Sequence, residues 1–298
     1  MPELPEVETI RLGLSRKIIG LKIKEIEVLA PKSFLGDPKL ASGQKILNIW
    51  RKAKILGIEL DLSITLLFHL KMSGQLILVK NQNSKIKSQK YNSKLKSEDR
   101  FIGGHPTKDM VGELPNKSTR VVFTFSDGSK LYFNDQRRFG WIRVIEGEEG
   151  LEVLEKLGPE PLEKEFTWQI LKSNLINHKS LPIKVALLDQ SIVSGIGNIY
   201  ASEACFNAGV DPRKKVADLT DHEFESLHRG VQQVLRDGIK YGGSTKTHFV
   251  DAEGHKGYFL DHAFVYWKDR YPCKNCGTII EKIQLRGRGT YFCPACQK

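Results

Sequence analysis

The chain has 298 residues, which is enough for one large domain or two ordinary domains with hydrophobic cores of their own. Lysine and arginine total 46 against 35 acidic residues, and the resulting net charge of +11 favours an anionic partner such as nucleic acid. No apolar run approaches the roughly 18 residues of a membrane span, and the acidic N-terminus is unlike a signal or transit peptide. We therefore expect a soluble, cytoplasmic protein without a membrane partner.

The first eight residues, Met1 to Glu8, combine an amine with carboxylates. Removal of Met1 would expose the secondary amine of Pro2, which is flanked by Glu3 and Glu6. An α-amino group titrates near ~8, so part of it is unprotonated at neutral pH and can attack an aldehyde-like carbon. The carboxylates could then move protons while the amine forms an imine with an opened sugar. The alternative is a frayed end that precedes an ordinary helix start.

A helix and a series of short strands follow this terminus. Apolar residues recur at helical spacing from Val7 to Ile18, which predicts a helix that begins at Pro5. Beyond it, short apolar stretches alternate with turn signals and predict strands over Leu21–Leu29, Ile46–Trp50, Ile55–Leu60, Thr65–Leu70, Gln75–Val79, Val121–Phe125, Lys130–Phe133 and Trp141–Ile145. So many short strands favour a β-sandwich or a barrel for the N-terminal half.

Three connections in this half carry residues that a plain sandwich does not need. They are Arg51–Lys54, His69–Gly74 and Asn134–Gly140. Basic residues beside a projecting Met72 or Phe139 suit a surface that binds phosphates and inserts an apolar wedge into a base stack. The alternative is that Met72 and Phe139 belong to the core and that the arginines line a solvated edge.

The middle of the chain contains a polar segment, a boundary and several helices. Lys80–Glu98 has few large apolar residues and is predicted as a disordered basic loop, whereas Gly158–Pro161 marks a domain boundary. Ser194–Asn198 places two glycines before a helix, where backbone N–H groups and the Asn198 side chain can bind a phosphate. An ordinary turn fits the same residues. Helices are predicted over Thr167–Ile176, Pro182–Asp189, Asn198–Ala208 and Asp221–Tyr241, the last with a capping box of Thr220 and Glu223.

The C-terminal region contains two Cys-x-x-Cys pairs, formed by Cys273, Cys276, Cys293 and Cys296. Their spacing predicts one structural zinc ion, since four thiolates leave no open coordination position. Ile279–Ile283 and Thr290–Phe292 are predicted strands of a ribbon, and Arg286–Gly289 is the predicted turn whose arginines fit the DNA backbone. The fifth cysteine, Cys205, lies in an apolar helical run and is predicted to be a buried structural thiol.

Together these residues resemble the formamidopyrimidine-DNA glycosylase family, bacterial enzymes that excise oxidised purines such as 8-oxoguanine and nick the resulting abasic site. The resemblance covers essentially the whole chain and rests on Pro2–Glu8, His69–Gly74, Arg137–Gly140, Leu188–Gln190, Gly195–Ala201 and Arg288–Thr290. It implies an α+β fold with three domains: an N-terminal catalytic β-sandwich with an N-terminal helix (1–150), a helical helix-two-turn-helix domain (151–262) and a C-terminal zinc finger (263–298). It also implies a monomer that binds double-stranded DNA containing oxidised bases or abasic sites.

The resemblance implies catalytic roles for five residues. Pro2 would be the nucleophile, Glu3 the general acid/base and Glu6 a structural support of the site. Lys54 would be a phosphate-binding cation that assists catalysis, and Arg288 would hold a phosphate beside the extruded nucleotide.

The same resemblance implies further contacts to DNA. His69 and Asn198 would hold phosphates around the extruded nucleotide. Met72, Arg137 and Phe139 would fill the gap that it leaves, with Arg137 pairing with the orphaned cytosine.

The chain departs from the family pattern at a few positions. Gln136 stands where the family usually has proline, which concerns the rigidity of the wedge loop, and Lys71 stands where glycine is common. Neither change removes a catalytic group. Lys80–Glu98 lengthens a loop that is usually shorter, and Ser244–Leu260 lies where the family has a mobile loop that caps the lesion.

Two alternatives remain open at this point. The endonuclease VIII branch of the superfamily shares the N-terminal proline and the zinc finger but removes oxidised pyrimidines. Leu4, Val7-Glu8 and the Arg-Arg-Phe sequence at Arg137–Phe139 look more like the purine branch. The second alternative is a non-catalytic zinc-ribbon protein that binds damaged DNA.

Overall fold

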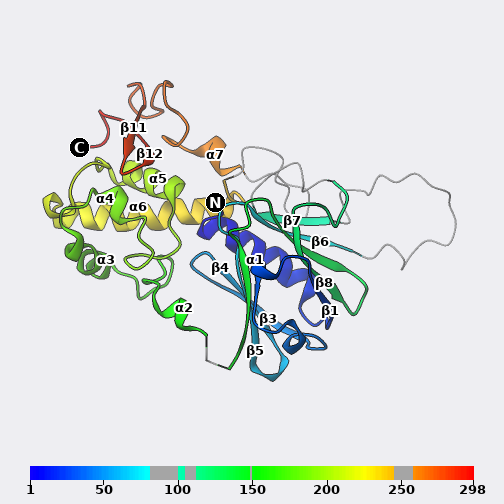
Figure 1. The fold of residues 1–298 in the computed structure, drawn as a ribbon. Coiled ribbons are helices and arrows are strands. Elements are labelled where there is room, and N and C mark those ends of the chain that lie inside the picture. Colours follow the sequence, from blue (N-terminus) through cyan, green and yellow to red (C-terminus); the bar gives the residue numbers. More distant parts are fainter. Residues whose placement is uncertain (81–99, 105–111, 148–149, 245–257) are drawn as a thin grey trace. The chain divides into compact units, whose positions relative to one another are not determined.

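A computed structural model describes residues 1–80, 100–104, 112–147, 150–244 and 258–298. The predicted loops Lys80–Glu98 and Ser244–Leu260 lie almost wholly outside these residues. The chain separates into two compact units, which are described one at a time (Figure 1). The first unit contains Met1–Pro2 and Glu6–Glu152, and the second contains Glu3–Pro5, Val153–Ser244 and Tyr258–Lys298. The division into three domains stays a prediction.

The first unit is built from two five-stranded sheets (Figure 1). One sheet has the order β1 (Ile23–Val28), β8 (Thr119–Phe125), β9 (Lys130–Asp135), β6 (Gly74–Val79) and β7 (Arg100–Gly104). The other has the order β2 (Phe34–Leu35), β10 (Trp141–Glu146), β5 (Ile64–His69), β4 (Ile55–Leu60) and β3 (Ile46–Lys52). Neighbouring strands are antiparallel except β2 and β10, which are parallel. Short 3-10 turns cover Pro31–Ser33, Pro38–Leu40 and Asp61–Ser63.

One hydrophobic core joins the inner faces of both sheets and helix α1 (Leu4–Ile18). Alternate residues of β6 show the pattern, since Leu76 and Leu78 belong to this core whereas Ile77 belongs to a smaller cluster. Close packing of α1 on β7 requires glycine, because a Cβ atom at Gly103 would lie 2.4 Å from Ile10. The predicted β-sandwich with an N-terminal helix is therefore confirmed.

All eight predicted strands of this unit are present, with small shifts at their ends. The hairpin between β8 and β9 turns through Ser126–Ser129, as the Asp-Gly pair predicts. The sequence did not reveal β2 or β7. β2 has only two residues, and β7 directly follows the polar segment Lys80–Glu98, where no apolar run marks a strand.

Helices dominate the second unit, with α2 over Glu152–Glu155, α3 over Trp168–Leu175, α4 over Ile183–Ala186, α5 over Asn198–Ala208, α6 over Asp221–Lys240 and α7 over Phe259–His262. Two 3-10 turns cover Ile176–His178 and Val216–Asp218. The capping box of Thr220 and Glu223 is confirmed at the start of α6. The helix predicted over Pro182–Asp189 is wrong in length, because only four residues are helical and the chain then turns through Leu188 and Gln190.

Helix α5 is buried on nearly every side. It packs closely on α6 at Gly230, where a Cβ atom would lie 2.8 Å from the Ala204 carbonyl oxygen. Cys205 is fully buried in this helix, and its burial raises the pKa of the thiol to about 12. The prediction of a structural thiol is consistent with this position.

The C-terminal ribbon consists of β11 (Glu281–Leu285) and β12 (Arg288–Phe292). They are joined by Arg286 and Gly287, which have positive φ angles of 48° and 74°, as a two-residue hairpin turn requires. The predicted four-residue turn was therefore too long, and Arg288 opens β12 instead.

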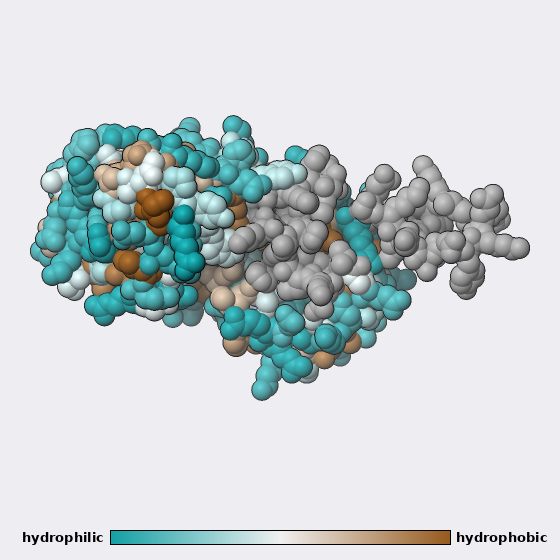
Figure 2. Space-filling model, turned by 90° about the horizontal axis from the view of Figure 1, so that it is seen from above, coloured by the Kyte–Doolittle hydropathy of each residue, from teal (hydrophilic) through white to brown (hydrophobic). Residues whose placement is uncertain are grey.

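Among the described residues, no helix combines the length and apolar character needed to cross a membrane. The face drawn in Figure 2 is mostly hydrophilic where it is coloured, and its hydrophobic residues form small separate patches.

Candidate functional site

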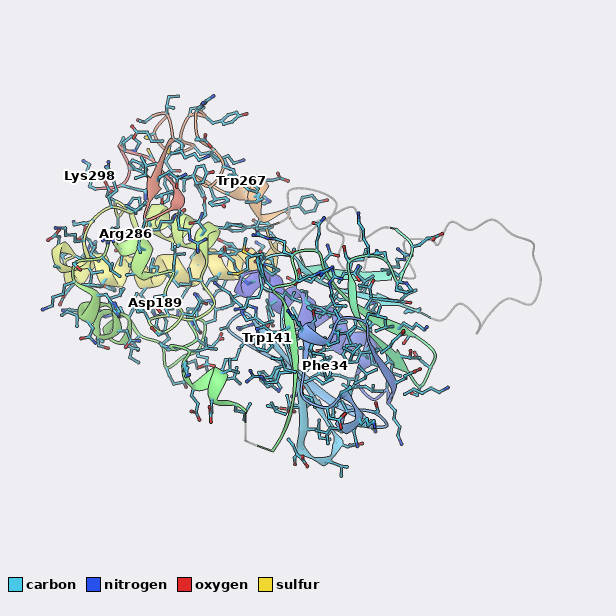
Figure 3. All side chains as sticks on the ribbon, in the orientation of Figure 1. Phe34, Trp141, Asp189, Trp267, Arg286 and Lys298 are labelled. Carbon is cyan, nitrogen blue, oxygen red and sulfur yellow. The ribbon has the colours of Figure 1, made fainter. Side chains whose placement is uncertain are left out.

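Two of the connections singled out in the sequence lie side by side in the first unit. One runs from His69 at the end of β5 to Gly74 at the start of β6, and the other runs from Asp135 at the end of β9 to Trp141 at the start of β10. His69 pairs with Trp141 in one sheet, and Gly74 pairs with Asp135 in the other. Both connections therefore join the neighbouring strands β5 and β10 of one sheet to the neighbouring strands β6 and β9 of the other. Trp141 is labelled in Figure 3.

The tips of these two loops carry exposed apolar side chains. Met72 is 38% exposed and Phe139 is 54% exposed, so neither is a core residue. Arg137 is exposed as well, and its guanidinium carbon lies 5.1 Å from the centre of the Phe139 ring. We name Leu70–Ser73 and Gln136–Gly140 the wedge loops. Their exposed tips could enter a base stack.

His69 is held as a neutral hydrogen-bond donor at the base of the first wedge loop. Burial, reinforced by the positive charges of Lys71 and Lys54, lowers the pKa of His69 to about 3. Its Nδ1 accepts a hydrogen bond of 3.0 Å from the backbone N–H of Lys71. The ring proton therefore resides on Nε2, which could donate to a phosphate.

Lys54 lies in a tight turn between β3 and β4 and is 5% exposed. Arg51 supports this turn by donating to the Ala53 carbonyl and to the Glu8 carboxylate of α1, each over 3.1 Å. Burial opposes ionisation of Glu8, yet the guanidinium groups of Arg11 and Arg51 lower its pKa overall. An ion-paired residue of the first helix thus fixes the turn that carries Lys54.

The N-terminal residues are largely buried. Met1 is 42% exposed, whereas Pro2 is buried and Glu6, in the first turn of α1, is 8% exposed. Pro2 is preceded by Met1, so its nitrogen is a peptide nitrogen until Met1 is removed. The exposure of Met1 leaves that residue accessible for removal.

Glu3 caps the N-terminus of α5. Its carboxylate accepts hydrogen bonds from the backbone N–H groups of Gly197 (2.7 Å), Ile199 (3.1 Å) and Tyr200 (3.5 Å). The helix dipole and these donors stabilise the negative charge of the carboxylate. Glu3 therefore occupies the N–H groups of Gly197, Ile199 and Tyr200, so these three groups are not available to the phosphate predicted at the start of α5.

The turn before α5 is fixed by Gln190. Its side chain accepts from the Gly195 N–H (3.0 Å) and donates to the Ile196 carbonyl (2.8 Å). The Gly195 carbonyl in turn accepts from the Leu4 N–H (3.0 Å). Gly195 has a positive φ of 84°, and a Cβ atom there would lie 2.6 Å from the Leu4 side chain. Glu3 and Leu4 are thus both hydrogen-bonded to this turn, Leu4 through Gly195 and Glu3 through Gly197.

Lys184 joins α4, α5 and the ribbon. This fully buried residue donates from Nζ to Asn198 Oδ1 (2.7 Å), to Thr290 Oγ1 (2.8 Å) and to the Gly289 carbonyl (3.1 Å). Burial lowers the pKa of Lys184 to about 8. Asn198 also donates to the Gly289 carbonyl (3.0 Å), and the Thr290 hydroxyl donates to the carbonyl of the exposed Arg288 (3.2 Å). Asn198 and Arg288, predicted to bind DNA, therefore belong to one hydrogen-bonded group.

A second buried carboxylate lies further along α5. Glu203 is 2% exposed and accepts hydrogen bonds from the backbone N–H groups of Phe264, Val265 and Tyr266, over 2.7 to 2.9 Å. Burial raises the pKa of Glu203 in spite of these donors. The carboxylate fixes the segment that leads into the ribbon.

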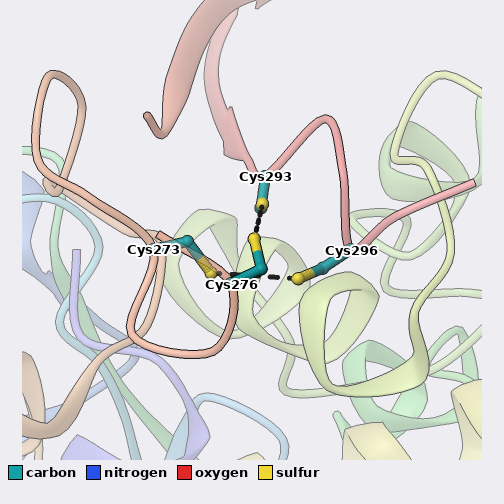
Figure 4. Close-up of side chains that lie close together, drawn as sticks. All are labelled: Cys273, Cys276, Cys293 and Cys296. Carbon is teal, nitrogen blue, oxygen red and sulfur yellow. Dashed lines mark hydrogen bonds between the residues drawn. The ribbon is translucent and has the colours of Figure 1, made fainter. Parts of the chain in front are cut away.

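The four C-terminal cysteines form a metal site. Their sulfur atoms all lie within 4.8 Å of one another (Figure 4). A tetrahedral zinc ion with Zn–S bonds of about 2.3 Å requires sulfur separations of about 3.8 Å. The distances from Cys273 to Cys296 (3.9 Å) and from Cys276 to Cys293 (3.5 Å) fit this requirement. The predicted ligand set is therefore suited to one structural zinc ion.

Family models match three stretches of the chain. They describe the formamidopyrimidine-DNA glycosylase N-terminal domain (residues 1–142), the H2TH domain of the same enzymes (157–250) and a zinc finger found in FPG and IleRS (272–298). The formamidopyrimidine-DNA glycosylase of Bacillus subtilis is 39% identical over 306 residues, which cover 100% of this chain and 99% of that protein. The chain belongs to the formamidopyrimidine-DNA glycosylase family.

Solved structures of other family members agree with this assignment. A mutant of the Lactococcus lactis FPG in complex with Fapy-dG-containing DNA has a TM-score of 0.82 and 31% identity, with 100% of each chain covered. The Lactococcus lactis Fpg in complex with DNA containing an abasic site has a TM-score of 0.82 and 30% identity, with 99% of each chain covered.

Several polar residues that fix the segments described above were not predicted from the sequence. Lys184 and Glu203 are single polar residues in predicted helices, and no local pattern marks them. Asp135 lies within the connection Asn134–Gly140 that was singled out, but its role in that connection was not predicted. Gln190 was quoted as part of a family motif, but its hydrogen bonds were not predicted. Glu8 was named as the last residue of the N-terminal motif, but its ion pairs were not predicted.

Proposed function

We propose that the chain is a bifunctional DNA glycosylase and abasic-site lyase, which acts as a monomer on double-stranded DNA and excises oxidised purines such as 8-oxoguanine and formamidopyrimidines. The full-length match to the family supports the glycosylase activity. The observation that carries the lyase proposal is the position of Glu3, whose carboxylate is fixed by three N–H groups directly beside Pro2 in the chain. A fixed carboxylate beside an amine nucleophile is the arrangement that imine chemistry needs.

The reaction proposed for Pro2 requires a free amine, and hence removal of Met1. The amine lone pair forms a bond to the sugar C1′ while the bond from C1′ to the base breaks, and the base leaves with that electron pair and takes up a proton. The attached nitrogen, which still carries its hydrogen, gives that proton to the Glu3 carboxylate. Glu3 then passes the proton to the ring oxygen as the bond from C1′ to that oxygen breaks, which leaves an iminium ion between Pro2 and C1′. The iminium acidifies the C2′ proton, so its loss expels the 3′ phosphate, and a second elimination expels the 5′ phosphate. Glu6 would support the site.

The wedge loops would make the nucleotide accessible. A base inside a duplex cannot be reached, so the nucleotide must rotate out of the stack, and the vacated space must be filled to offset lost stacking. Met72 and Phe139 are exposed at loop tips, as this role requires. Arg137, beside the Phe139 ring, would pair with the orphaned cytosine.

The cations of the site would bind the phosphates around the extruded nucleotide. His69 would donate from Nε2, and Lys54 and Arg288 would contribute positive charge. Asn198, held beside Arg288 by its hydrogen bond to the Gly289 carbonyl, would bind a further phosphate. Zinc bound to the four cysteines would supply folding energy rather than chemistry, because it keeps the hairpin that carries Arg288 folded.

Borohydride trapping tests this proposal. The full chain, after removal of Met1, is incubated with a duplex that contains 8-oxoguanine opposite cytosine, and borohydride should reduce the iminium to a stable covalent complex. A version with an N-terminal extension is the control and should neither be trapped nor cleave the strand. A chain that binds lesion DNA but forms no complex would be the non-catalytic binding protein.

Substrate choice separates the two enzymatic alternatives. We expect faster excision of 8-oxoguanine opposite cytosine than of thymine glycol in the same sequence. The reverse preference would assign the chain to endonuclease VIII-like pyrimidine repair.

A further inference from the structure

The two wedge loops share a buried hydrogen-bonded pair. Ser73 ends the first loop and is 3% exposed, and Asp135 precedes the second loop and is fully buried. The Ser73 hydroxyl donates to Asp135 Oδ1. Gly74 and Asp135 are partners in the register of β6 and β9, which places the two side chains where both loops leave the sheet.

This pair binds the backbone of the second wedge loop at both ends. The Arg137 N–H donates to the Ser73 hydroxyl (2.9 Å) and to Asp135 Oδ1 (3.2 Å). The Gly140 N–H donates to Asp135 Oδ2 (2.6 Å). A Cβ atom at Gly140 would lie only 3.0 Å from that oxygen and 2.8 Å from the Phe133 ring, so glycine is needed for this close approach. Residues from both loops therefore meet at one carboxylate.

Both wedge loops also contain a non-glycine residue in the left-handed region. Lys71 has a φ of 49°, and Arg138 has a φ of 60°. Such conformations cost of order 1 kcal/mol or more and persist only where the surroundings fix them. The hydrogen bonds of Ser73 and Asp135 flank Arg138, and Ser73 closes the loop that contains Lys71. The pair is therefore placed to hold both loops in their strained forms.

We propose that Ser73 and Asp135 are positioning residues that join the two wedge loops into one unit, so that Met72 and Phe139 enter the duplex together. This inference rests on the proposed function, because it assigns a shared support to the wedge of that function. The pair acts through the loops and does not itself touch DNA. A carboxylate that served only to stabilise the fold would affect every activity of the protein alike.

The other end of β9 offers a matched control. There the Ser129 hydroxyl donates to Asp127 Oδ1 over 2.6 Å, and Ser129 is also 3% exposed. Ser129→Ala therefore removes the same kind of hydrogen bond, at the opposite end of β9 from Asp135. Ser73→Ala is the test variant, and Ser73→Thr keeps a hydroxyl for rescue.

Two substrates are compared under single-turnover conditions: 8-oxoguanine opposite cytosine, and a preformed abasic site in the same duplex. Extruding a paired, stacked base needs the wedge more than an abasic site does. Ser73→Ala should slow excision of 8-oxoguanine about tenfold, the effect of one lost hydrogen bond to a charged group. Cleavage at the abasic site, which has no paired base to extrude, should slow by less than about threefold. Ser129→Ala should leave both rates unchanged, and Ser73→Thr should restore most of the excision rate.

Coupling between the loops is measured by a double-mutant cycle. Met72→Ala and Phe139→Ala should have non-additive effects on excision in the wild-type background and additive effects when Ser73→Ala is also present. Equal losses on both substrates, or additive effects in every background, would overturn the proposal.

Hydrogen exchange separates a failure of the positioning role from a failure of the proposed function. If the wild-type chain excises no 8-oxoguanine, the proposed function fails, and hydrogen exchange then decides the positioning claim. Ser73→Ala should accelerate exchange of the Arg137 and Gly140 amides, whereas Ser129→Ala should not. Unchanged exchange in Ser73→Ala would contradict the claim.

Discussion

Acidification is expected to destabilise the first unit through His69. The pKa of this ring is about 3 in the folded chain against an ordinary value of 6.5. Between these values the unfolded chain binds a proton that the folded chain does not, so stability is present above pH 6.5 and is lost as the pH falls towards 3. Each pH unit in this window corresponds to about 1.4 kcal/mol. At pH 5 the loss from His69 alone should therefore be about 2 kcal/mol.

The assay compares urea unfolding at pH 7 and pH 5 for the wild type and for His69→Gln. Since other groups titrate in the same range, the difference between the two proteins isolates the His69 contribution. The variant should lose about 2 kcal/mol less than the wild type on acidification. His222→Gln, which replaces an exposed histidine, is the control and should behave as the wild type. Equal losses in wild type and His69→Gln, or an imidazole that titrates near 6.5 by NMR, would refute the reasoning.

Three further substitutions test other parts of the site. Cys276→Ser should lose zinc, unfold the ribbon locally and flatten the salt dependence of lesion-DNA binding by about one phosphate contact; normal binding at every salt concentration would show that the ribbon does not bind DNA. Glu3→Gln should slow base excision by ~10²–10⁴-fold while binding to an abasic-site analogue stays largely intact, and excision at the wild-type rate would remove Glu3 from its role. Lys184→Met leaves three acceptors without their ammonium donor and should lower the unfolding free energy of the second unit by on the order of 3 kcal/mol. Lys184→Arg, which keeps the charge, should lose less, and equal stability of Lys184→Met and wild type would contradict the assigned hydrogen bonds.

Local patterns in the sequence predicted most of the fold. The helical spacing from Val7 to Ile18, the Asp127-Gly128 turn and the Thr220 capping box all act over a few residues, and each is present in the structure. Prediction failed where the local signal was weak. β7 follows a polar segment, so no apolar run marks it. The predicted ribbon turn Arg286–Gly289 is too long, because it contains two glycines and only Gly287 lies in the turn.

The site was predicted by residue type, but its supports were not. Met72 and Phe139 were singled out from their neighbours in sequence, and the strand register explains why their loops lie side by side. Ser73 and Asp135 are 62 residues apart, and Glu3 is 194 residues from Gly197, so no local pattern could pair them.

The rigidity of the second wedge loop illustrates the same limit. Gln136 stands where the family usually has proline, so the sequence predicts a less rigid loop. In the structure the loop is instead fixed by the side chain of Asp135, which binds the N–H groups of Arg137 and Gly140. A buried carboxylate can thus fix a loop whose sequence lacks the expected proline.

Peptide mapping of the borohydride-trapped complex tests the central claim most directly. The wild-type chain, freed of Met1 and trapped on 8-oxoguanine DNA, is digested, and the peptide that carries the nucleotide adduct is identified by mass spectrometry. The account predicts that the adduct lies on the nitrogen of Pro2. An adduct on an internal lysine such as Lys54 or Lys184, with Pro2 unmodified, would contradict it.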